Sequence, residues 1–209
     1  MSAPPALTVR KLGLTDYQSA WQDMQAFTDK RSDNTPDELW FLQHPPVFTL
    51  GRNSKQEHLH NTGDIPVIRT DRGGQVTYHG PGQLIVYPLL NIKRRQLGVQ
   101  SLVRILEQSV IDLLSDYSLA AQRREKAPGV YVNERKLAAL GLRIRKGCSF
   151  HGLSLNVDMD LSPFSMIDPC GYSDLEVTQL KDLGVDASME TISTQLQTHF
   201  ERLLDKPAP

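Results

Sequence analysis

Two segments of this 209-residue chain carry side chains that could form and break an acyl bond. In Met166-Ile-Asp-Pro-Cys-Gly171, Cys170 lies between a proline and a glycine, so we expect it on a turn, where reactive side chains are often displayed. At a free pKa near 8.5 only about 3% of a thiol is thiolate at pH 7, so a nucleophilic cysteine needs an activator. Cys148 stands in a predicted strand beside Phe150 and is expected to pack in the core.

Lys136 is the candidate activator, at the start of a predicted strand rich in small and aliphatic residues. A lysine in this position could simply extend its ammonium group into water. If the ammonium is instead held near Cys170, its positive charge favours the thiolate and lowers the cysteine pKa. Small residues at Ala138, Ala139 and Gly141 would leave room for a bound chain beside the strand.

The segment 72–83, Arg-Gly-Gly-Gln-Val-Thr-Tyr-His-Gly-Pro-Gly-Gln, contains four glycines and a proline. Glycines at 73 and 74 would let the backbone lie against a ligand with no Cβ in between. A rigid turn at 80–82 follows Tyr78 and His79. The segment therefore predicts a strand, a turn that contacts a ligand, and a second strand; an ordinary hairpin with unusual turn residues is the alternative. We expect His151-Gly152 to contribute to the same pocket.

The composition narrows the classes of function. Lys and Arg number 23 against 24 Asp and Glu, and this balance argues against bulk nucleic-acid binding. Two cysteines make no disulfide framework, and no set of His and Cys residues completes a metal site. The longest apolar run, 84–90, is far shorter than the ~20 residues of a membrane span, and the first ten residues lack the apolar stretch of a signal peptide. We expect a cytoplasmic protein that binds neither membrane nor nucleic acid.

The elements that must position these residues follow from periodicity. A helix is predicted to begin at Thr15, with a capping box to Gln18 and an apolar stripe at Tyr17, Trp21, Met24 and Phe27. Two more helices are predicted, one at 101–117 with an apolar stripe at Leu102, Leu106, Val110 and Leu113, and one at 189–204. Strands are predicted at 7–12, 39–42, 47–50, 66–70, 75–79, 83–89, 130–133, 136–145 and 149–157, the last three separated by turns at Asn133-Glu134 and Lys146-Gly147. Many strands between few helices predict one α+β domain over 1–209, with a mixed or antiparallel sheet flanked by helices.

Taken together, four segments resemble the lipoyl(octanoyl) transferase family: RGGQVTYHGPGQ at 72–83, KLAALGLRI at 136–144, FHGLSLNV at 150–157 and IDPCG at 167–171. The resemblance implies a fold shared with the catalytic domains of lipoate- and biotin-protein ligases. It also implies that Cys170 is the acyl-thioester nucleophile and that Lys136 tunes the thiol and shuttles protons. The implied substrate-binding residues are Arg72, Gly73, Gly74, Gln75, Val76, Thr77, Tyr78, His79, Ala139, Leu140, Gly141, Gly152, Leu153 and Ser154.

The same resemblance implies the partners. The donor would be octanoyl-acyl carrier protein, and the acceptor a lysine on lipoyl domains of 2-oxoacid dehydrogenase E2 subunits or on the glycine-cleavage H protein. Thioester exchange is nearly neutral in energy and amide formation runs downhill, so no cofactor, ATP or metal is expected. Two basic clusters are candidate docking surfaces for an acidic carrier: Lys93, Arg94 and Arg95, and Arg143, Arg145 and Lys146.

Three other functions remain open from the sequence. An ATP-dependent lipoate or biotin ligase would share the fold but needs no cysteine, and the Gly-Arg-Gly-Arg-type loop of biotin ligases is absent. A cysteine hydrolase could use Cys170 with His79 or His151. A binding module that only sequesters acyl chains would keep its function without Cys170.

Overall fold

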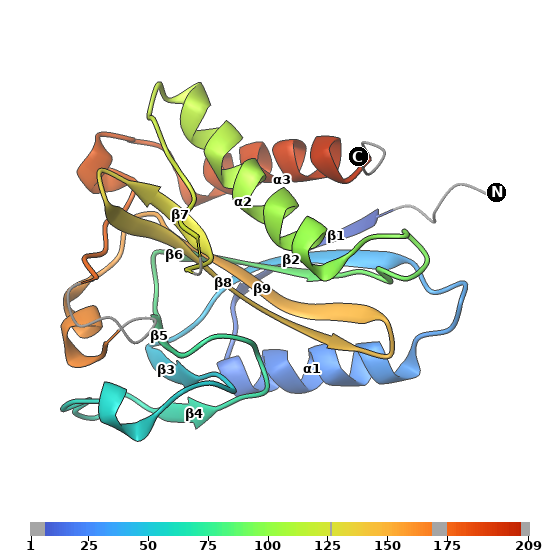
Figure 1. Ribbon diagram of the computed structural model, residues 1–209, viewed down its shortest axis with the longest axis horizontal. Coiled ribbons are helices and arrows are strands. Elements are labelled where there is room, and N and C mark those ends of the chain that lie inside the picture. The colour runs from blue at the N-terminus through green and yellow to red at the C-terminus, as the bar shows by residue number, and fades with distance from the viewer. Residues whose placement is uncertain (1–6, 126, 169–174, 206–209) are drawn as a thin grey trace.

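The computed structural model describes residues 7–125, 127–168 and 175–205, and a six-stranded mixed sheet forms its centre (Figure 1). Strand β1 pairs in parallel with β2, and every further neighbour in the sheet is antiparallel. In spatial order the strands are β1 (Leu7–Leu14), β2 (Asp37–Gln43), β6 (Gln83–Leu89), β9 (Cys148–Asn156), β8 (Arg135–Arg145) and β7 (Gly129–Val132).

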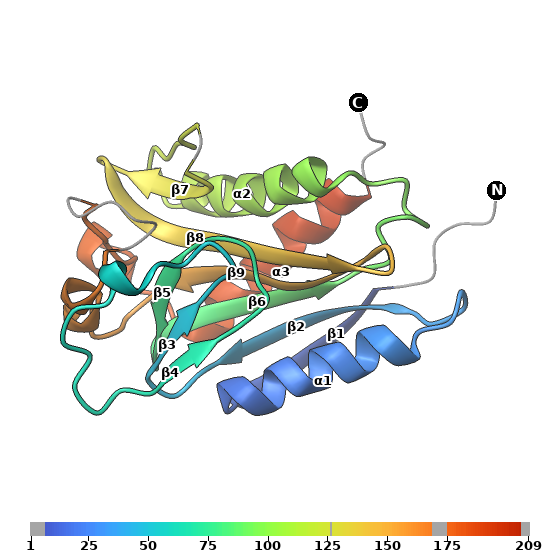
Figure 2. The same ribbon diagram turned by 60° about the horizontal axis from the view of Figure 1, so that its bottom comes forward.

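A smaller sheet lies against one side of the large one. Its order is β4 (Val67–Arg69), β3 (Val47–Leu50) and β5 (Val76–His79), with β3 parallel to β4 and antiparallel to β5. Helix α1 (Tyr17–Lys30) lies on the same side of the large sheet as these three strands (Figure 2). Helices α2 (Val99–Asp116) and α3 (Met189–Leu204) cover the opposite side. The predicted α+β fold with a mixed sheet is confirmed.

The core explains this layering. All seven residues of β6 are buried, as expected of a central strand covered on both faces. The predicted stripe of α2, Leu102, Leu106, Val110 and Leu113, is completely buried against the sheet and α3. On the other face, Met24 of α1 packs into a separate apolar cluster with residues of β2, β6 and β9.

One predicted helix start is wrong. Asp16, not Thr15, caps α1: its side chain accepts a hydrogen bond from the backbone N–H of Ser19. The Thr15 hydroxyl instead donates to the carbonyl of Leu12. Thr15 and Asp16 can both cap a helix, because either side chain can accept a hydrogen bond from a free N–H group of the first turn. The sequence alone therefore does not decide between them.

The predicted turns at Asn133-Glu134 and Lys146-Gly147 are confirmed. Both pairs have positive φ angles, 46° and 65° in the first and 52° and 76° in the second. Such angles match the right-handed twist of the hairpins β7–β8 and β8–β9. In the described part of the chain, the connections contain the short 3₁₀ helices η1 (Gln56–His58), η2 (Ser162–Met166) and η4 (Lys181–Leu183). Within the described ranges, no helix has the length and apolar character needed to cross a membrane.

Candidate active site

Arg72 organises the loop that precedes β5. Its side chain is buried and its guanidinium donates to the carbonyl oxygens of Thr49 (2.6 Å), Gly73 (2.9 Å) and Gln75 (2.6 Å). It also donates to the Thr49 hydroxyl. Five donors in a rigid fork suit this task, since one side chain fixes several backbone groups of the loop at once.

The glycines of this loop allow it to lie directly on β8. The N–H of Gly73 donates to the carbonyl of Leu142 at 2.9 Å, and a Cβ on Gly141 would come within 2.8 Å of the Gly73 carbonyl oxygen. Gly74 has a φ of +85°, which favours glycine. The expected close approach therefore exists, but at Gly73 the neighbour is strand β8 rather than open space for a ligand.

Between this loop and the large sheet lies a cavity with an empty volume of about 500 Å³ that includes its mouth. The cavity is lined by Tyr17, Arg72, Gly74, Gln75, Val76, Thr77, His79, Ile85, Tyr87, Ala139, Leu140, Gly141, His151, Gly152, Leu153 and Ser154.

The structure thus gathers most of the sequence-predicted binding residues around one cavity. The exceptions are Gly73 and Tyr78, which are not among the lining residues. The ring of Tyr78 packs instead against Phe48 and Phe164, at centroid distances of 5.4 and 5.6 Å. The sequence reasoning missed the floor of the cavity, formed by Tyr17 of α1 and by Ile85 and Tyr87 of β6. Tyr17 belongs to the predicted apolar stripe of the first helix, and such a stripe does not show whether a side chain packs in the core or lines a cavity.

A β-bulge points Lys136 to the cavity side of the sheet. Val130 is paired with Ala138, but the next residue, Tyr131, is paired with Lys136, so Leu137 is an extra residue in β8. Leu137 and Ala138 both pack into the core beneath α2 and α3. Consequently Lys136 falls on the opposite face, as a bulge interrupts the alternation of side chains.

Gly129 provides the space that the Lys136 side chain occupies. A Cβ on Gly129 would lie 2.6 Å from Cε and 3.4 Å from Nζ of Lys136. The ammonium lies 5.5 Å from the ring centre of Tyr131, and the lysine is only 4% exposed. Glu107 of α2 fixes Gly129, since its carboxylate accepts the Gly129 N–H at 3.0 Å.

Cys170 falls in 169–174, outside the described residues, so its predicted place beside Lys136 stays a prediction. The chain on both sides of this segment is anchored. The Asp168 N–H donates to the carbonyl of His58 at 3.0 Å, and the Lys136 N–H donates to the carbonyl of Glu176 at 2.8 Å. Glu176 is six residues after Cys170 in the sequence.

Cys148 has the environment of a structural cysteine. It is 4% exposed, and burial raises the pKa of its thiol. A raised pKa leaves even less thiolate at neutral pH, which fits the predicted packing role.

The histidines beside the cavity are neutral. Burial lowers the pKa of His79 well below its ordinary value, and its Nδ1–H donates to the Gln83 side-chain oxygen at 2.7 Å. Burial also lowers the pKa of His44 to about 4. The ring of His44 donates to the carbonyl of Thr15 and accepts the Tyr87 hydroxyl proton at 2.8 Å. Both rings therefore form hydrogen bonds that hold the protein together, and His79 is poorly placed to act as the base of a hydrolase.

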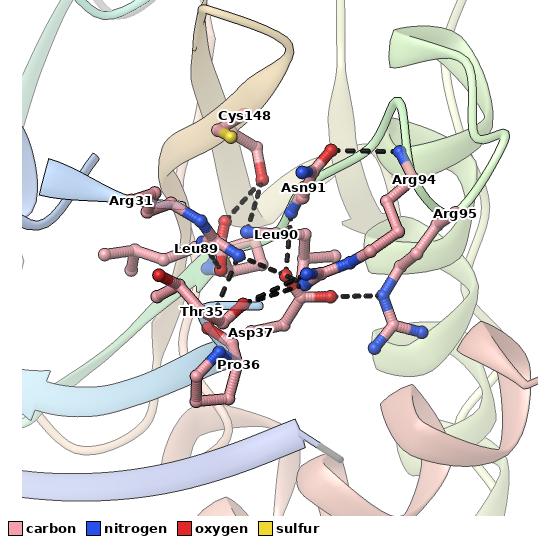
Figure 3. A network of polar contacts seen from close by, with 12 residues as sticks. Arg31, Thr35, Pro36, Asp37, Leu89, Leu90, Asn91, Arg94, Arg95 and Cys148 are labelled. Carbon is pink, nitrogen blue, oxygen red and sulfur yellow. Dashed lines mark hydrogen bonds and ion pairs between the residues drawn. The ribbon is translucent and has the colours of Figure 1, made fainter. Parts of the chain in front are cut away.

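One of the two basic clusters is not a free docking surface. Arg94 and Arg95 turn inward to the fully buried carboxylate of Asp37, at 2.8 and 2.6 Å, and Arg31 joins them (Figure 3). The docking prediction is therefore wrong for these two arginines, because their charges hold the loop before β2 in place. In the other cluster, Arg145 and Lys146 form ion pairs with Asp29, and Arg143 lies 3.8 Å from the carboxylate of Asp71. Within the part of the chain that the structure describes, no three His, Cys, Asp or Glu side chains are grouped as metal ligands.

Known proteins resemble this fold and sequence. The family model of the lipoyl protein ligase A/B catalytic domain matches residues 16–201. Octanoyltransferases of Shewanella sp. (strain W3-18-1) and Shewanella oneidensis are each 59% identical over 198 residues, which cover 95% of this chain and 91% of theirs.

Among solved structures, a lipoate-protein ligase A bound with ATP has a TM-score of 0.77 at 17% identity, covering 97% of this chain and 86% of that one. A biotin protein ligase of Aquifex aeolicus has a TM-score of 0.58 at 15% identity, covering 98% and 70%. These two likenesses concern the fold alone.

The fold is thus that of the acyl-ligase and acyltransferase catalytic domains. The chain belongs to the lipoyl protein ligase A/B catalytic domain family.

Proposed function

We propose that this chain is an octanoyltransferase that carries the acyl group on Cys170 and delivers it to a lysine of a lipoyl domain. The observation that carries the octanoyl-transfer activity is the 59% identity, over 95% of the chain, to proteins named octanoyltransferase. The cysteine, the lysine and the partners go beyond that observation. They are supported by the sequence motifs and by the geometry around Lys136.

In the first step, the Cys170 thiolate attacks the carbonyl carbon of the octanoyl thioester on the donor. The bond to the donor sulfur breaks, and that sulfur leaves as a thiolate that takes its proton from the Lys136 ammonium, which leaves Lys136 as a neutral amine. The acyl group is now a thioester on Cys170, at almost no cost in free energy because one thioester replaces another. The ammonium of Lys136 favours the attacking thiolate, since a nearby positive charge stabilises it.

In the second step, the amine of the acceptor lysine attacks the Cys170 thioester. The C–S bond breaks, the thiolate of Cys170 is regenerated, and an amide is formed. The attacking amine must lose a proton, and we propose that the neutral amine of Lys136 takes it, which restores the ammonium for the next cycle. The position of its side chain beside Gly129 and Tyr131 supports this assignment, because a buried lysine held in one place can exchange a proton with one particular reacting atom.

The cavity supplies the acyl-binding site in this proposal. Ala139 has a small side chain, and Gly141 and Gly152 also line the cavity, so an alkyl chain can lie against β8 and β9. Enclosure of the chain also keeps water from the thioester, which a transferase must do and a hydrolase must not. The short distance along the chain from Cys170 to Glu176, which binds the backbone of Lys136, allows the thiol to reach the mouth of this cavity.

The proposed partners are an acyl carrier protein as donor and lipoyl domains as acceptors, those of 2-oxoacid dehydrogenase E2 subunits and the glycine-cleavage H protein. An archaeal lipoate protein ligase, described together with its E2 lipoyl domain, has the same fold at a TM-score of 0.75 and 19% identity, which supports a lipoyl domain as acceptor. Cytoplasm, where thiols stay reduced, is the location that we propose for this reaction.

The decisive experiment is intact mass spectrometry of the protein after incubation with octanoyl-acyl carrier protein. The mass should rise by one octanoyl group, which hydroxylamine removes, and Cys170→Ser should abolish both the adduct and transfer to a lipoyl domain. Cys148→Ser is the matched control, because that thiol is buried away from the cavity, and it should keep the adduct. A Cys170→Ser protein that acylates its acceptor at the wild-type rate would refute the thioester mechanism.

An ATP-dependent ligase is the second candidate, because the fold matches lipoate-protein ligase A bound with ATP. It would activate free octanoate rather than accept it from a carrier. Transfer from the carrier in the absence of ATP decides between the two: it is expected for the transferase and impossible for the ligase.

A further inference from the structure

His151 lines the cavity and has no task in the transfer steps above, yet its backbone is strained. It has a φ of +55° in the middle of β9, where side chains other than glycine rarely adopt the left-handed region. As a result its ring stacks on that of the preceding residue, Phe150, at 5.0 Å, instead of alternating to the other face. Strain of this kind is often kept at functional sites.

Asp71 fixes the protonation of the His151 ring. Its carboxylate oxygen Oδ1 accepts the indole N–H of Trp21 at 2.9 Å and lies 2.9 Å from Nε2 of His151. Burial alone would raise the pKa of Asp71, but these hydrogen bonds outweigh it, and the pKa is lowered. An ionised carboxylate can only accept, so Nε2 carries the ring proton.

The other ring nitrogen is then a free acceptor. Burial lowers the pKa of His151, so at neutral pH Nδ1 bears no proton. This nitrogen is buried and has no hydrogen-bond partner among the residues that the structure describes, and the residue is 1% exposed. The side-chain oxygen of Gln75, another cavity residue, is buried and unpartnered as well. Two buried acceptors without donors are costly, so the walls here suit a group that donates hydrogen bonds.

Along the sheet, His151 lies away from the end of the Lys136 side chain. The Lys136 side chain ends beside Gly129, which is paired with Ala139, whereas His151 is paired with Leu142. The three residues from Ala139 to Leu142 span about 10 Å of strand. An extended octanoyl group is about 9 Å long, from seven bonds of ~1.5 Å at tetrahedral angles. A chain with its carbonyl at the Lys136 end therefore brings its terminal carbon close to His151.

We propose that His151 forms a polar end wall that limits the acyl chain to about eight carbons and accepts a hydrogen bond from a donor at the chain's far end. This inference rests on the proposed acyl-transfer function and adds the specificity of the same site. A longer saturated chain displaces water from Nδ1 of His151 without replacing its hydrogen bonds, and such a displacement weakens binding. A long chain that ends in a hydroxyl group restores them.

The experiment compares octanoyl-, decanoyl- and 10-hydroxydecanoyl-acyl carrier protein as donors and measures kcat/KM for each by mass spectrometry of the acylated lipoyl domain. With wild-type protein, decanoyl should fall at least about fivefold below octanoyl, and 10-hydroxydecanoyl should recover at least that factor, the equivalent of one hydrogen bond of ~1 kcal/mol. Equal rates for decanoyl and 10-hydroxydecanoyl would overturn the proposal, and this outcome needs no variant.

The variant His151→Phe keeps an aromatic ring and removes both nitrogens. It should raise the decanoyl-to-octanoyl ratio by about fivefold and abolish the advantage of the hydroxyl group. The control is His199→Phe on α3, a histidine also held by a carboxylate, that of Asp116 at 2.6 Å, but not part of the cavity wall. It should leave both ratios unchanged, and an unchanged ratio in His151→Phe would refute the end wall. The octanoyl adduct on Cys170 is recorded in the same samples, so that its absence would refute the transfer function instead.

Discussion

Gly129→Ala is the change that tests most directly whether acyl transfer depends on the position of the Lys136 side chain beside Gly129. Gly129 has a φ of +150°, which an L residue rarely adopts. Its added Cβ would lie 2.6 Å from both the Ala138 carbonyl oxygen and Cε of Lys136. The Ala138 oxygen belongs to the backbone of β8 and cannot move easily, whereas the lysine side chain can. We therefore expect the lysine to be displaced.

The expected magnitudes differ for stability and for transfer. The backbone conformation alone costs about 1–3 kcal/mol once a Cβ is present, a loss that a domain of ordinary stability survives. Displacement of the Lys136 ammonium by about 1 Å can lower the transfer rate roughly 100-fold, because catalysis depends on placement at this scale. Gly184→Ala is the matched control: its φ is +82°, but no atom lies within 4 Å of its added Cβ. It should lose only the stability that the backbone conformation costs and keep its transfer rate.

The assay combines thermal unfolding with single-turnover transfer at a temperature where both variants are folded. Rates are expressed per folded molecule. If the loss of activity relative to the loss of stability is the same in Gly129→Ala and Gly184→Ala, the position of the Lys136 side chain has no catalytic importance and the prediction is wrong.

Two further predictions concern charge. Lys136→Met removes the ammonium and should raise the pH at which Cys170 reacts with iodoacetamide. Lys136→Arg keeps a charge that cannot deprotonate, so it should preserve alkylation but not transfer. An unchanged alkylation profile in the methionine variant would exclude Lys136 as activator. Asp37→Asn should lower stability at pH 7 by about 3–5 kcal/mol, because the buried arginines around it lose their counter-charge. Burial alone would raise the pKa of Asp37, but the Asn91 N–H and the arginines outweigh it and lower the pKa. Its contribution is therefore complete above the unfolded pKa of about 3.9 and disappears as pH falls through the folded value. Urea unfolding between pH 2 and 7 should show this acid loss in wild type and a flatter profile in Asp37→Asn; parallel profiles would contradict it.

The sequence predicted most of the elements because their patterns are local. The helix 189–204 and the strands 47–50 and 83–89 have the predicted bounds, and the stripe of α2 is buried as expected. Three- and four-residue periodicity reports a buried face directly. The small sheet and its position over β8 follow from contacts between distant segments, such as the hydrogen bond from Gly73 to Leu142, which no local pattern encodes.

The basic cluster at 93–95 shows how charge alone can mislead. Three consecutive cations in a sequence are typical of a solvated surface. Here two of them neutralise one carboxylate, Asp37, which comes more than fifty residues earlier in the chain. The pairing requires β2 and the segment after β6 to meet, and that meeting is a property of the fold.

Lys136 and His151 owe their places to irregularities that a regular pattern hides. In a regular strand, residues 136 and 139 would face opposite sides of the sheet, and so would 150 and 151. The extra residue Leu137 in β8 and the left-handed backbone of His151 in β9 change both alternations. Each irregularity turns a polar side chain to the face that the cavity occupies. Because hydrophobic periodicity would place both side chains elsewhere, the bulge and the strained histidine are themselves evidence that these two positions serve the site rather than the core.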